Sequence, residues 1–250
     1  PTSAHTAAVL GNAPRFTLDG DDALEHQLAQ TCARVLSGIR GLVPSGKLEA
    51  ILLGGGYGRG EGGVLRGTAG DRPYNDLEFY VLLEGNRHVN ELRYGRRLEV
   101  LGEILTHLAD VEIEFKITSL AEMAARPVSM FSYDLVAGHR VLHCSSRARN
   151  LPGCHHHHGA ESIPASEATR LLMNRCSGLL FARIELEDTA LGAPAADFVR
   201  RNLAKVQLAC GDAVLAAFGR YHWSCRERHR RLRQLAASEP WPWLDGVARH

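Results

Sequence analysis

Four carboxylates occur as two pairs in which a single residue separates the members. Asp76 and Glu78 form the first pair, in Asp76-Leu77-Glu78, and Glu112 and Glu114 form the second. Both segments alternate acidic and apolar residues, which is typical of a strand with one solvated face, and side chains two apart on a strand share a face. If the two strands are neighbours, we expect three or four carboxylates to converge on one patch.

Such a patch of carboxylates indicates a cation site. Like charges at close range repel one another and lose hydration, so the patch is costly unless a cation neutralises it. Hard oxygen ligands in this number suit Mg²⁺ or Mn²⁺, and two such ions about 4 Å apart can support phosphoryl or nucleotidyl transfer. The alternative for either pair is a half-exposed strand with a solvated acidic face.

A glycine-rich segment, GGGYGRGEGG, covers residues 54–63 directly after an apolar stretch. Glycine lets a phosphate approach the backbone amides without a Cβ in the way, and Arg59 can donate to a triphosphate oxygen. The P-loop pattern fails because no GK[ST] follows. The dinucleotide-binding pattern matches formally at Gly58, Gly60 and Gly63, but the sequence that follows cannot open a helix. The alternative is a glycine-rich surface loop without a ligand.

The glycine segment and the acidic pairs together resemble the DNA polymerase β-like nucleotidyltransferase superfamily. Its pattern is an apolar residue with Gly-Gly or Gly-Ser, then Asp-apolar-Asp/Glu, then a third acidic residue on a later strand. Here these are Leu53-Gly54-Gly55-Gly56, Asp76-Leu77-Glu78 and Val111-Glu112-Ile113, within residues 48–117. The resemblance implies a small mixed sheet flanked by helices. It also implies a reaction in which an acceptor attacks the α-phosphate of a nucleoside triphosphate and pyrophosphate leaves.

The resemblance also implies roles for individual residues. Asp76, Glu78 and Glu112 would hold the metal ions and carry the catalysis. The phosphates of the nucleotide would lie on the glycine segment, at Gly55, Gly56, Tyr57, Gly58, Arg59 and Gly60. Glu114 leaves the third metal ligand ambiguous, and we prefer Glu112 because it opens its strand. About twenty residues separate the glycines from Asp76, more than is usual in the family, so an insertion is expected there.

The spacing of apolar residues predicts the elements that position these groups. Helices are expected at residues 21–42 and 91–108, and strands at residues 48–53, 76–83 and 111–117. This order predicts an α+β fold with a small mixed β-sheet and flanking helices. We expect a loose N-terminal arm at residues 1–20 and a nucleotidyltransferase-like domain at residues 21–143.

The second part of the chain differs in composition. Residues 144–165 are rich in Ser, Arg, Pro, Gly and His and are expected to form a linker. Helical spacing then predicts an α-helical bundle domain at residues 166–250, with its first helix capped by Ser166. Lys205, one of only three lysines, is our candidate for a phosphate contact; the alternative is a solvated helix face.

Charge is distributed unevenly between these parts. Residues 76–122 contain 10 acidic and 5 basic side chains, whereas residues 200–233 contain 9 basic and 2 acidic side chains. An acidic domain that holds metal and a basic helical domain together suit a triphosphate with its ions. The arginines of residues 226–233 could also bind a nucleic acid backbone. Few aromatic residues interleave with them, which favours solvated arginines or arginines that face a second copy in a homodimer.

Composition excludes several classes of protein. The 250 residues carry a formal charge of +1 and 45% hydrophobic residues, enough for one large or two small globular domains. No apolar run approaches the roughly 18 residues that span a bilayer, and no signal peptide is evident, so we expect a cytoplasmic protein without membrane contact. The six cysteines include no CxxC pair and are expected to be reduced and mostly buried. His155–His158 suit a mobile loop better than a closed metal site.

The function expected from these observations is that of a Mg²⁺- or Mn²⁺-dependent nucleotidyltransferase. It would transfer NMP, first of all AMP from ATP, to a hydroxyl or phosphate of a small-molecule or protein acceptor. One alternative is a catalytically inactive protein of the same fold that senses nucleotide or binds a partner, which would bind triphosphate without releasing pyrophosphate. Another is an RNA-binding module that uses the arginine-rich helix, whose salt-dependent binding would survive Asp76→Ala.

Overall fold

The computed structural model describes residues 14–187, 192–239 and 241–249, and the chain divides into two compact units. The first, called the sheet unit below, consists of Pro1–Ala125 and Gly138–Cys154. The second, called the helical unit, consists of Arg126–Ala137 and His155–His250. This division differs from the expected one, because residues 126–137 belong with the C-terminal helices.

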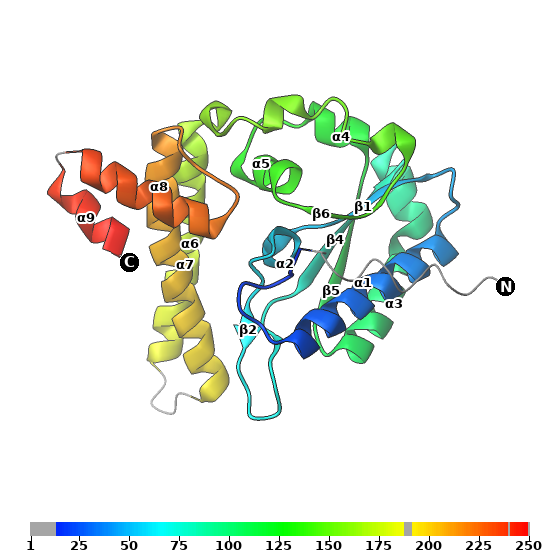
Figure 1. The fold of residues 1–250 in the computed structure, drawn as a ribbon, viewed down its shortest axis with the longest axis horizontal. Helices are drawn as coiled ribbons and strands as arrows, with labels where there is room; N and C mark the ends of the chain where they lie inside the picture. The colour runs from blue at the N-terminus through cyan, green and yellow to red at the C-terminus, as the bar shows by residue number, and fades with distance from the viewer. Residues whose placement is uncertain (1–13, 188–191, 240, 250) are drawn as a thin grey trace. The chain divides into compact units, whose positions relative to one another are not determined.

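The sheet unit contains a four-stranded mixed sheet with helices packed on it (Figure 1). Its elements are α1 (Asp22–Leu42), β1 (Leu48–Leu53), α2 (Gly55–Arg59), β2 (Val64–Leu65), β3 (Arg72–Pro73), β4 (Leu77–Leu83), α3 (Arg87–Ala109), β5 (Ile113–Thr118), α4 (Leu120–Ala125), β6 (Arg140–Cys144) and the short 3₁₀ helix η1 (Ser146–Ala148). The strand order is β5-β4-β1-β6, and β4 and β5 run parallel whereas β1 is antiparallel to both of its neighbours. The expected α+β fold with a small mixed sheet and flanking helices is confirmed.

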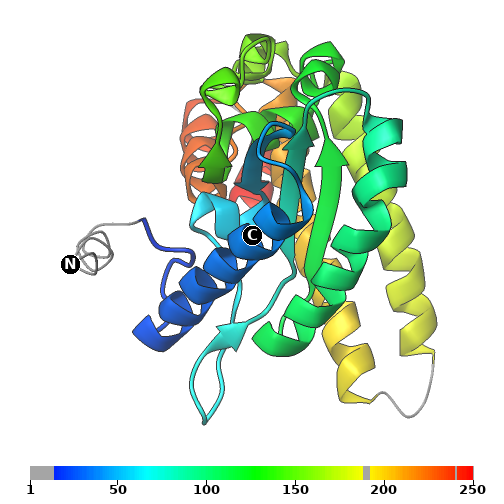
Figure 2. The ribbon, with the colours of Figure 1, turned by 90° about the vertical axis from the view of Figure 1, so that its right-hand side faces the viewer.

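The two long helices α1 and α3 cover one face of this sheet, as Figure 2 shows. Apolar residues at helical spacing on α1, such as Leu28 and Val35, pack with Leu98 of α3 and with Phe79 and Val81 of β4 in one buried core. Because side chains alternate along a strand, Glu78 and Tyr80 lie on the opposite face of β4. The core therefore fixes the strand whose other face carries the first acidic pair.

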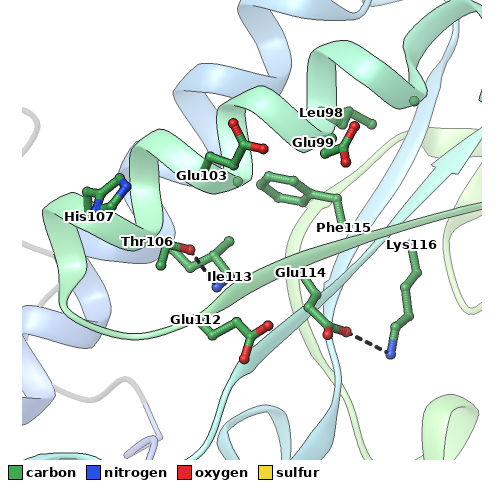
Figure 3. A pocket seen from close by; sticks show the side chains of 12 residues that line it. Leu98, Glu99, Glu103, Thr106, His107, Glu112, Ile113, Glu114, Phe115 and Lys116 are labelled. Atoms are coloured by element: carbon green, nitrogen blue, oxygen red, sulfur yellow. Dashed lines mark hydrogen bonds and ion pairs between the residues drawn. The ribbon is translucent and has the colours of Figure 1, made fainter.

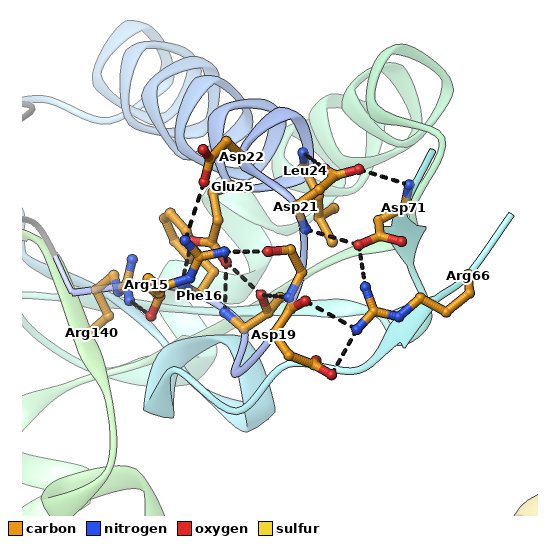
Figure 4. Close-up of polar contacts among 12 residues, drawn as sticks. Arg15, Phe16, Asp19, Asp21, Asp22, Leu24, Glu25, Arg66, Asp71 and Arg140 are labelled. Carbon is orange, nitrogen blue, oxygen red and sulfur yellow. Dashed lines mark hydrogen bonds and ion pairs between the residues drawn. The ribbon is translucent and has the colours of Figure 1, made fainter. Parts of the chain in front are cut away.

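The segment before α1 is bound to the sheet unit, in contrast to the expected loose arm. Residues 1–13 lie outside the described residues, but Phe16 and Thr17 are buried, and Thr17 forms a β-bridge with Gly62. Glu25 of α1 accepts hydrogen bonds from the backbone N–H groups of Phe16 and Thr17 at 2.7 and 2.9 Å (Figure 4). Arg66 forms ion pairs with Asp19 and Asp71 in the same network, so this segment and the chain after the glycines are joined.

The glycine segment is partly helical rather than a loop throughout, because α2 begins directly after β1. Several of its glycines allow close packing. A Cβ at Gly58 would lie 2.1 Å from the carbonyl oxygen of Leu53, and a Cβ at Gly62 would lie 2.0 Å from Cδ1 of Tyr57. Gly60 ends α2 in the left-handed conformation, with φ of +77°. These three glycines are therefore required by the fold, whether or not a ligand binds.

We expect Gly58→Ala to destabilise the sheet unit by about 1–3 kcal/mol, because the added methyl overlaps the Leu53 carbonyl. Urea unfolding followed by circular dichroism measures this change. Gly41→Ala is the matched control: it lies in α1, no atom lies within 4 Å of its Cβ position, and alanine should stabilise the helix by up to about 1 kcal/mol. Equal stabilities of the two variants would contradict the packing argument.

The helical unit contains α5 (Met130–Ala137), two short 3₁₀ helices, η2 (His155–His157) and η3 (Ala160–Ser162), and four longer elements. These are α6 (Ala165–Leu186), α7 (Ala193–Ala217), α8 (Cys225–Ser238) and α9 (Pro242–Arg249). Pro164, not Ser166, occupies the N-cap position of α6. The buried core of the helical unit includes Tyr133 of α5, Leu215 of α7, Leu235 of α8 and Leu244 of α9. This core explains why α5, which precedes β6 in the chain, belongs to the helical unit.

The expected linker at residues 144–165 is folded. Cys154 and His157 are fully buried, and the segment is shaped by short 3₁₀ turns whose backbone hydrogen bonds run between near neighbours. The expectation that the cysteines are mostly buried is wrong for half of them. Cys32 and Cys154 are buried, Cys225 is intermediate, and Cys144, Cys176 and Cys210 are exposed; across the described chain none of the six forms a disulfide.

Candidate functional site

Parallel pairing of β4 and β5 brings carboxylates from two strands together. The register pairs Leu77 with Ile113 and Glu78 with Glu114, so these two acidic side chains leave the same face side by side. Asp76 directly precedes β4. Carboxylate oxygens of Asp76, Glu78 and Glu114 all lie within 4.8 Å of one another, and we call these three residues the acidic cluster. In the described chain they form the only group of three His, Cys, Asp or Glu side chains with such spacing.

The third member of the acidic cluster is Glu114, whereas the sequence analysis preferred Glu112. Glu112 lies before β5 begins at Ile113, and its backbone carbonyl accepts a hydrogen bond from Leu77 N–H at 2.8 Å. Its side chain is exposed and is not one of the three whose oxygens converge. The residue at the start of the strand, Glu112, is therefore not the residue that pairs with Glu78.

Sequence analysis missed a cation at the acidic cluster. Nζ of Lys116 lies 2.5 Å from Oε1 of Glu78 and 3.2 Å from Oε2 of Glu114, and the second of these contacts is drawn in Figure 3. Partial burial by itself would lower the pKa of the Lys116 ammonium, but the hydrogen bonds and charges of the carboxylates outweigh it and raise the pKa. The missed signal was alternation, since residues 112, 114 and 116 share one strand face.

The first residue of α2 lies next to the acidic cluster. Gly54 N–H donates to the carbonyl oxygen of Glu78 at 2.9 Å, which joins the end of β1 to the start of β4. Gly55 has a φ of +61°, and a Cβ there would lie 3.6 Å from Oε2 of Glu78. Among the glycines expected to bind phosphate, Gly55 is therefore the one that the structure places beside the carboxylates. Gly56 follows it in α2, where its Cβ position lies 3.1 Å from the carbonyl oxygen of Glu61.

Tyr57 is a positioning residue rather than an exposed phosphate contact. Its side chain is 1% exposed, and burial raises the pKa of its hydroxyl. The hydroxyl donates to the Gly63 carbonyl at 2.6 Å and accepts from the backbone N–H groups of Tyr74 and Asn75 at 2.9 and 3.3 Å. Tyr57 thereby holds the chain that leads into Asp76. Arg59, at the end of α2, is half-buried.

An open pocket of about 690 Å³ lies between α3 and β5 (Figure 3). It shares Glu114 with the acidic cluster, and Glu112 and Lys116 line it as well. Glu99 and Glu103 of α3 add two further carboxylates to the wall. Such a wall attracts a cationic group and repels a triphosphate, so the pocket and the glycine side of the cluster suit different ligands.

The comparisons with known proteins do not place this chain in a family. No protein-family model, no curated protein and no solved structure matches it. Among the described helices, none is both long and apolar enough to cross a membrane.

The remaining candidates lie in the helical unit. Lys205 is exposed on α7, and its role as a phosphate contact stays a prediction. On α8, Arg228 is buried, and Arg230 and Arg231 form ion pairs with Glu227, so part of the arginine-rich surface is occupied by contacts within the helix. The buried His157 shows that the histidine run is not simply a mobile loop.

Proposed function

We propose that this protein is a Mg²⁺-dependent nucleotidyltransferase, with ATP as the first candidate donor and a small molecule or a protein as the acceptor. The observation that carries the proposal is the convergence of Asp76, Glu78 and Glu114 beside the first turn of α2. Three carboxylates from two neighbouring strands are a donor set that suits Mg²⁺ or Mn²⁺, which prefer hard oxygen ligands. The same arrangement offers backbone amides next to the carboxylates, where the phosphates would bind.

The proposed reaction exchanges one phosphoester link for another. An acceptor oxygen forms a bond to the α-phosphorus, the bond from that phosphorus to its bridging oxygen breaks, and pyrophosphate leaves with the electron pair. The bound Mg²⁺ would supply positive charge to the phosphate oxygens as negative charge develops on them. Asp76, Glu78 and Glu114 would hold the ion, Gly55 and Gly56 would bind the phosphates, and Glu112, exposed at the pocket, would accept the proton of the acceptor.

The acidic pocket favours a small acceptor with positive charge over long nucleic acid. Its carboxylates on α3 and β5 would repel a polyphosphate backbone but attract an amine or guanidine group. Because the pocket shares Glu114 with the acidic cluster, an acceptor bound there would lie next to the metal ligands. This placement agrees with a role for Glu112 in deprotonation.

A second candidate function is favoured by Lys116. Its ammonium already pairs with two of the three carboxylates and could take the place of the catalytic metal ion. The protein would then bind nucleotide without catalysing a reaction. Such a protein would bind triphosphate but release no pyrophosphate.

Thermal unfolding in the presence of ATP, GTP, CTP or UTP tests the proposal, with Mg²⁺ or with EDTA. At a hundred times its dissociation constant a ligand adds about 2.7 kcal/mol, which corresponds to roughly 5–10 °C for a chain of this size. We expect a Mg²⁺-dependent shift for one nucleotide that Asp76→Ala abolishes. Asp71→Ala is the control carboxylate, because Asp71 pairs with Arg66 away from the cluster. Absence of any shift with wild type at millimolar nucleotide would refute the proposed site.

A further inference from the structure

Lys116 contacts the acidic cluster and has no role in the proposed reaction. It leaves the same face of β5 as Glu114, and the strand register sets it beside Tyr80 of β4. Its ammonium lies 2.5 Å from Glu78 Oε1, 3.2 Å from Glu114 Oε2 and 5.8 Å from the centre of the Tyr80 ring. A cation held by two carboxylates and an aromatic face has a defined position.

Lys116 contacts only part of the acidic cluster, so other carboxylate oxygens are left that could hold an ion. Lys116 contacts one oxygen of Glu78 and one of Glu114. The second oxygen of Glu78, Oε2, is the one that lies toward Gly55. With the second oxygen of Glu114 and the carboxylate of Asp76, this set can supply the few protein ligands that one Mg²⁺ requires beside its waters.

The net charge of the acidic cluster together with Lys116 also indicates a single bound metal ion. The three carboxylates carry three negative charges, and the ammonium of Lys116 carries one positive charge, so the cluster has a net charge of minus two before substrate binds. One divalent ion neutralises this charge, whereas two would leave an excess of positive charge. Enzymes of the two-metal type use the two ions together to stabilise the attacking and leaving oxygens, and an ammonium can supply part of that positive charge.

We propose that Lys116 takes the place of one of the two divalent ions, so that the acidic cluster binds a single Mg²⁺ and the ammonium supplies the second positive centre. This inference rests on the proposed function, because it assumes that the cluster binds a metal ion. Lys116 is then a positioning residue: it orients Glu78 and Glu114 and prevents a second ion from binding between them.

The test is the number of Mn²⁺ ions bound per chain in the absence of nucleotide, measured by electron paramagnetic resonance of free Mn²⁺. We expect one ion for wild type and a second ion for Lys116→Met, bound at least tenfold more tightly than any second ion on wild type. Lys116→Arg should keep the wild-type number. Lys47→Met is the matched control, since Lys47 is 43% exposed against 41% for Lys116 and pairs with Glu84 at 3.5 Å.

The outcomes separate this inference from the proposed function. Two ions on wild type, or one ion on both wild type and Lys116→Met, would leave the metal site intact but overturn the role of Lys116. No ion on wild type and one or more on Lys116→Met would show that the ammonium replaces all metal, which also overturns the inference. No ion on either protein would refute the proposed metal site itself. Unchanged melting temperatures of the variants confirm that they fold.

Discussion

Replacement of Glu78 by glutamine is expected to lower the rate of pyrophosphate release from ATP about a thousandfold. Glu78 is central to the site: its side chain contacts Lys116, its neighbour in register is Glu114, and its second oxygen lies toward Gly55. Glutamine has the same shape but removes a charge that would hold the metal ion of the proposed function. Metal ions contribute several kcal/mol to such transition states, and each 1.36 kcal/mol is tenfold in rate.

Pyrophosphate release, with Mg²⁺ and a panel of amine-bearing acceptors, measures this effect. Glu91→Gln is the control, because Glu91 is a carboxylate of α3 that pairs with Arg87 and belongs neither to the lining of the pocket nor to the acidic cluster. We expect it to retain at least a third of the rate. If the Glu78→Gln protein folds normally and releases pyrophosphate at a rate within tenfold of wild type, the acidic cluster does not carry the catalysis.

The acidic strands could be predicted from the sequence because their signal is local. Alternation in Asp76-Leu77-Glu78 and in Glu112-Ile113-Glu114 fixes which side chains share a face, and the structure has strands at both places. The register between the two strands is not a local property. It depends on how α3, which connects β4 to β5 in the sequence, packs on the sheet. A shift by two residues would exchange Glu112 and Glu114, and for this reason the sequence alone left the third ligand open.

The glycine segment was harder to interpret for a different reason. Glycine has a low intrinsic helix propensity, so local rules predict a loop where α2 forms. Contacts with distant residues decide the conformation: Gly58 packs on the Leu53 carbonyl, and the Tyr57 hydroxyl binds the backbone of Tyr74 and Asn75. Alternation along β5 places Lys116 on the same face as Glu114, but its contact with Glu78 depends on the register between β4 and β5, which no local pattern gives.

Composition alone does not predict the folded state of residues 144–165. Polar and glycine-rich composition is typical of a linker, yet Cys154 and His157 are fully buried. The grouping of α5 with the helical unit also depends on contacts that are distant in sequence, because Asp134 of α5 meets Tyr221, which follows α7. Only the folded helical unit shows that these residues belong together.

The second large effect is expected in the helical unit, where Arg228 is 8% exposed. Its Nε lies 3.0 Å from Asp212 Oδ1 of α7, and its NH1 group donates to the Tyr221 hydroxyl at 2.6 Å. That hydroxyl donates in turn to Asp134 Oδ2 of α5 at 3.1 Å. One buried guanidinium thus connects α8 with α7 directly and with α5 through Tyr221.

We expect Arg228→Met to destabilise the helical unit by about 3 kcal/mol, because it removes a buried cation from the partly buried Asp212 carboxylate, whose side chain is 15% exposed. Arg230→Met is the control on the same helix: Arg230 is 56% exposed and pairs with Glu227 in solvent, so its loss should change the stability far less. All three tryptophans, Trp223, Trp241 and Trp243, lie in the helical unit, so fluorescence during urea unfolding reports on this unit alone. If the two variants unfold at the same urea concentration, the buried ion pair does not hold α5, α7 and α8 together, and the apolar core must do so by itself.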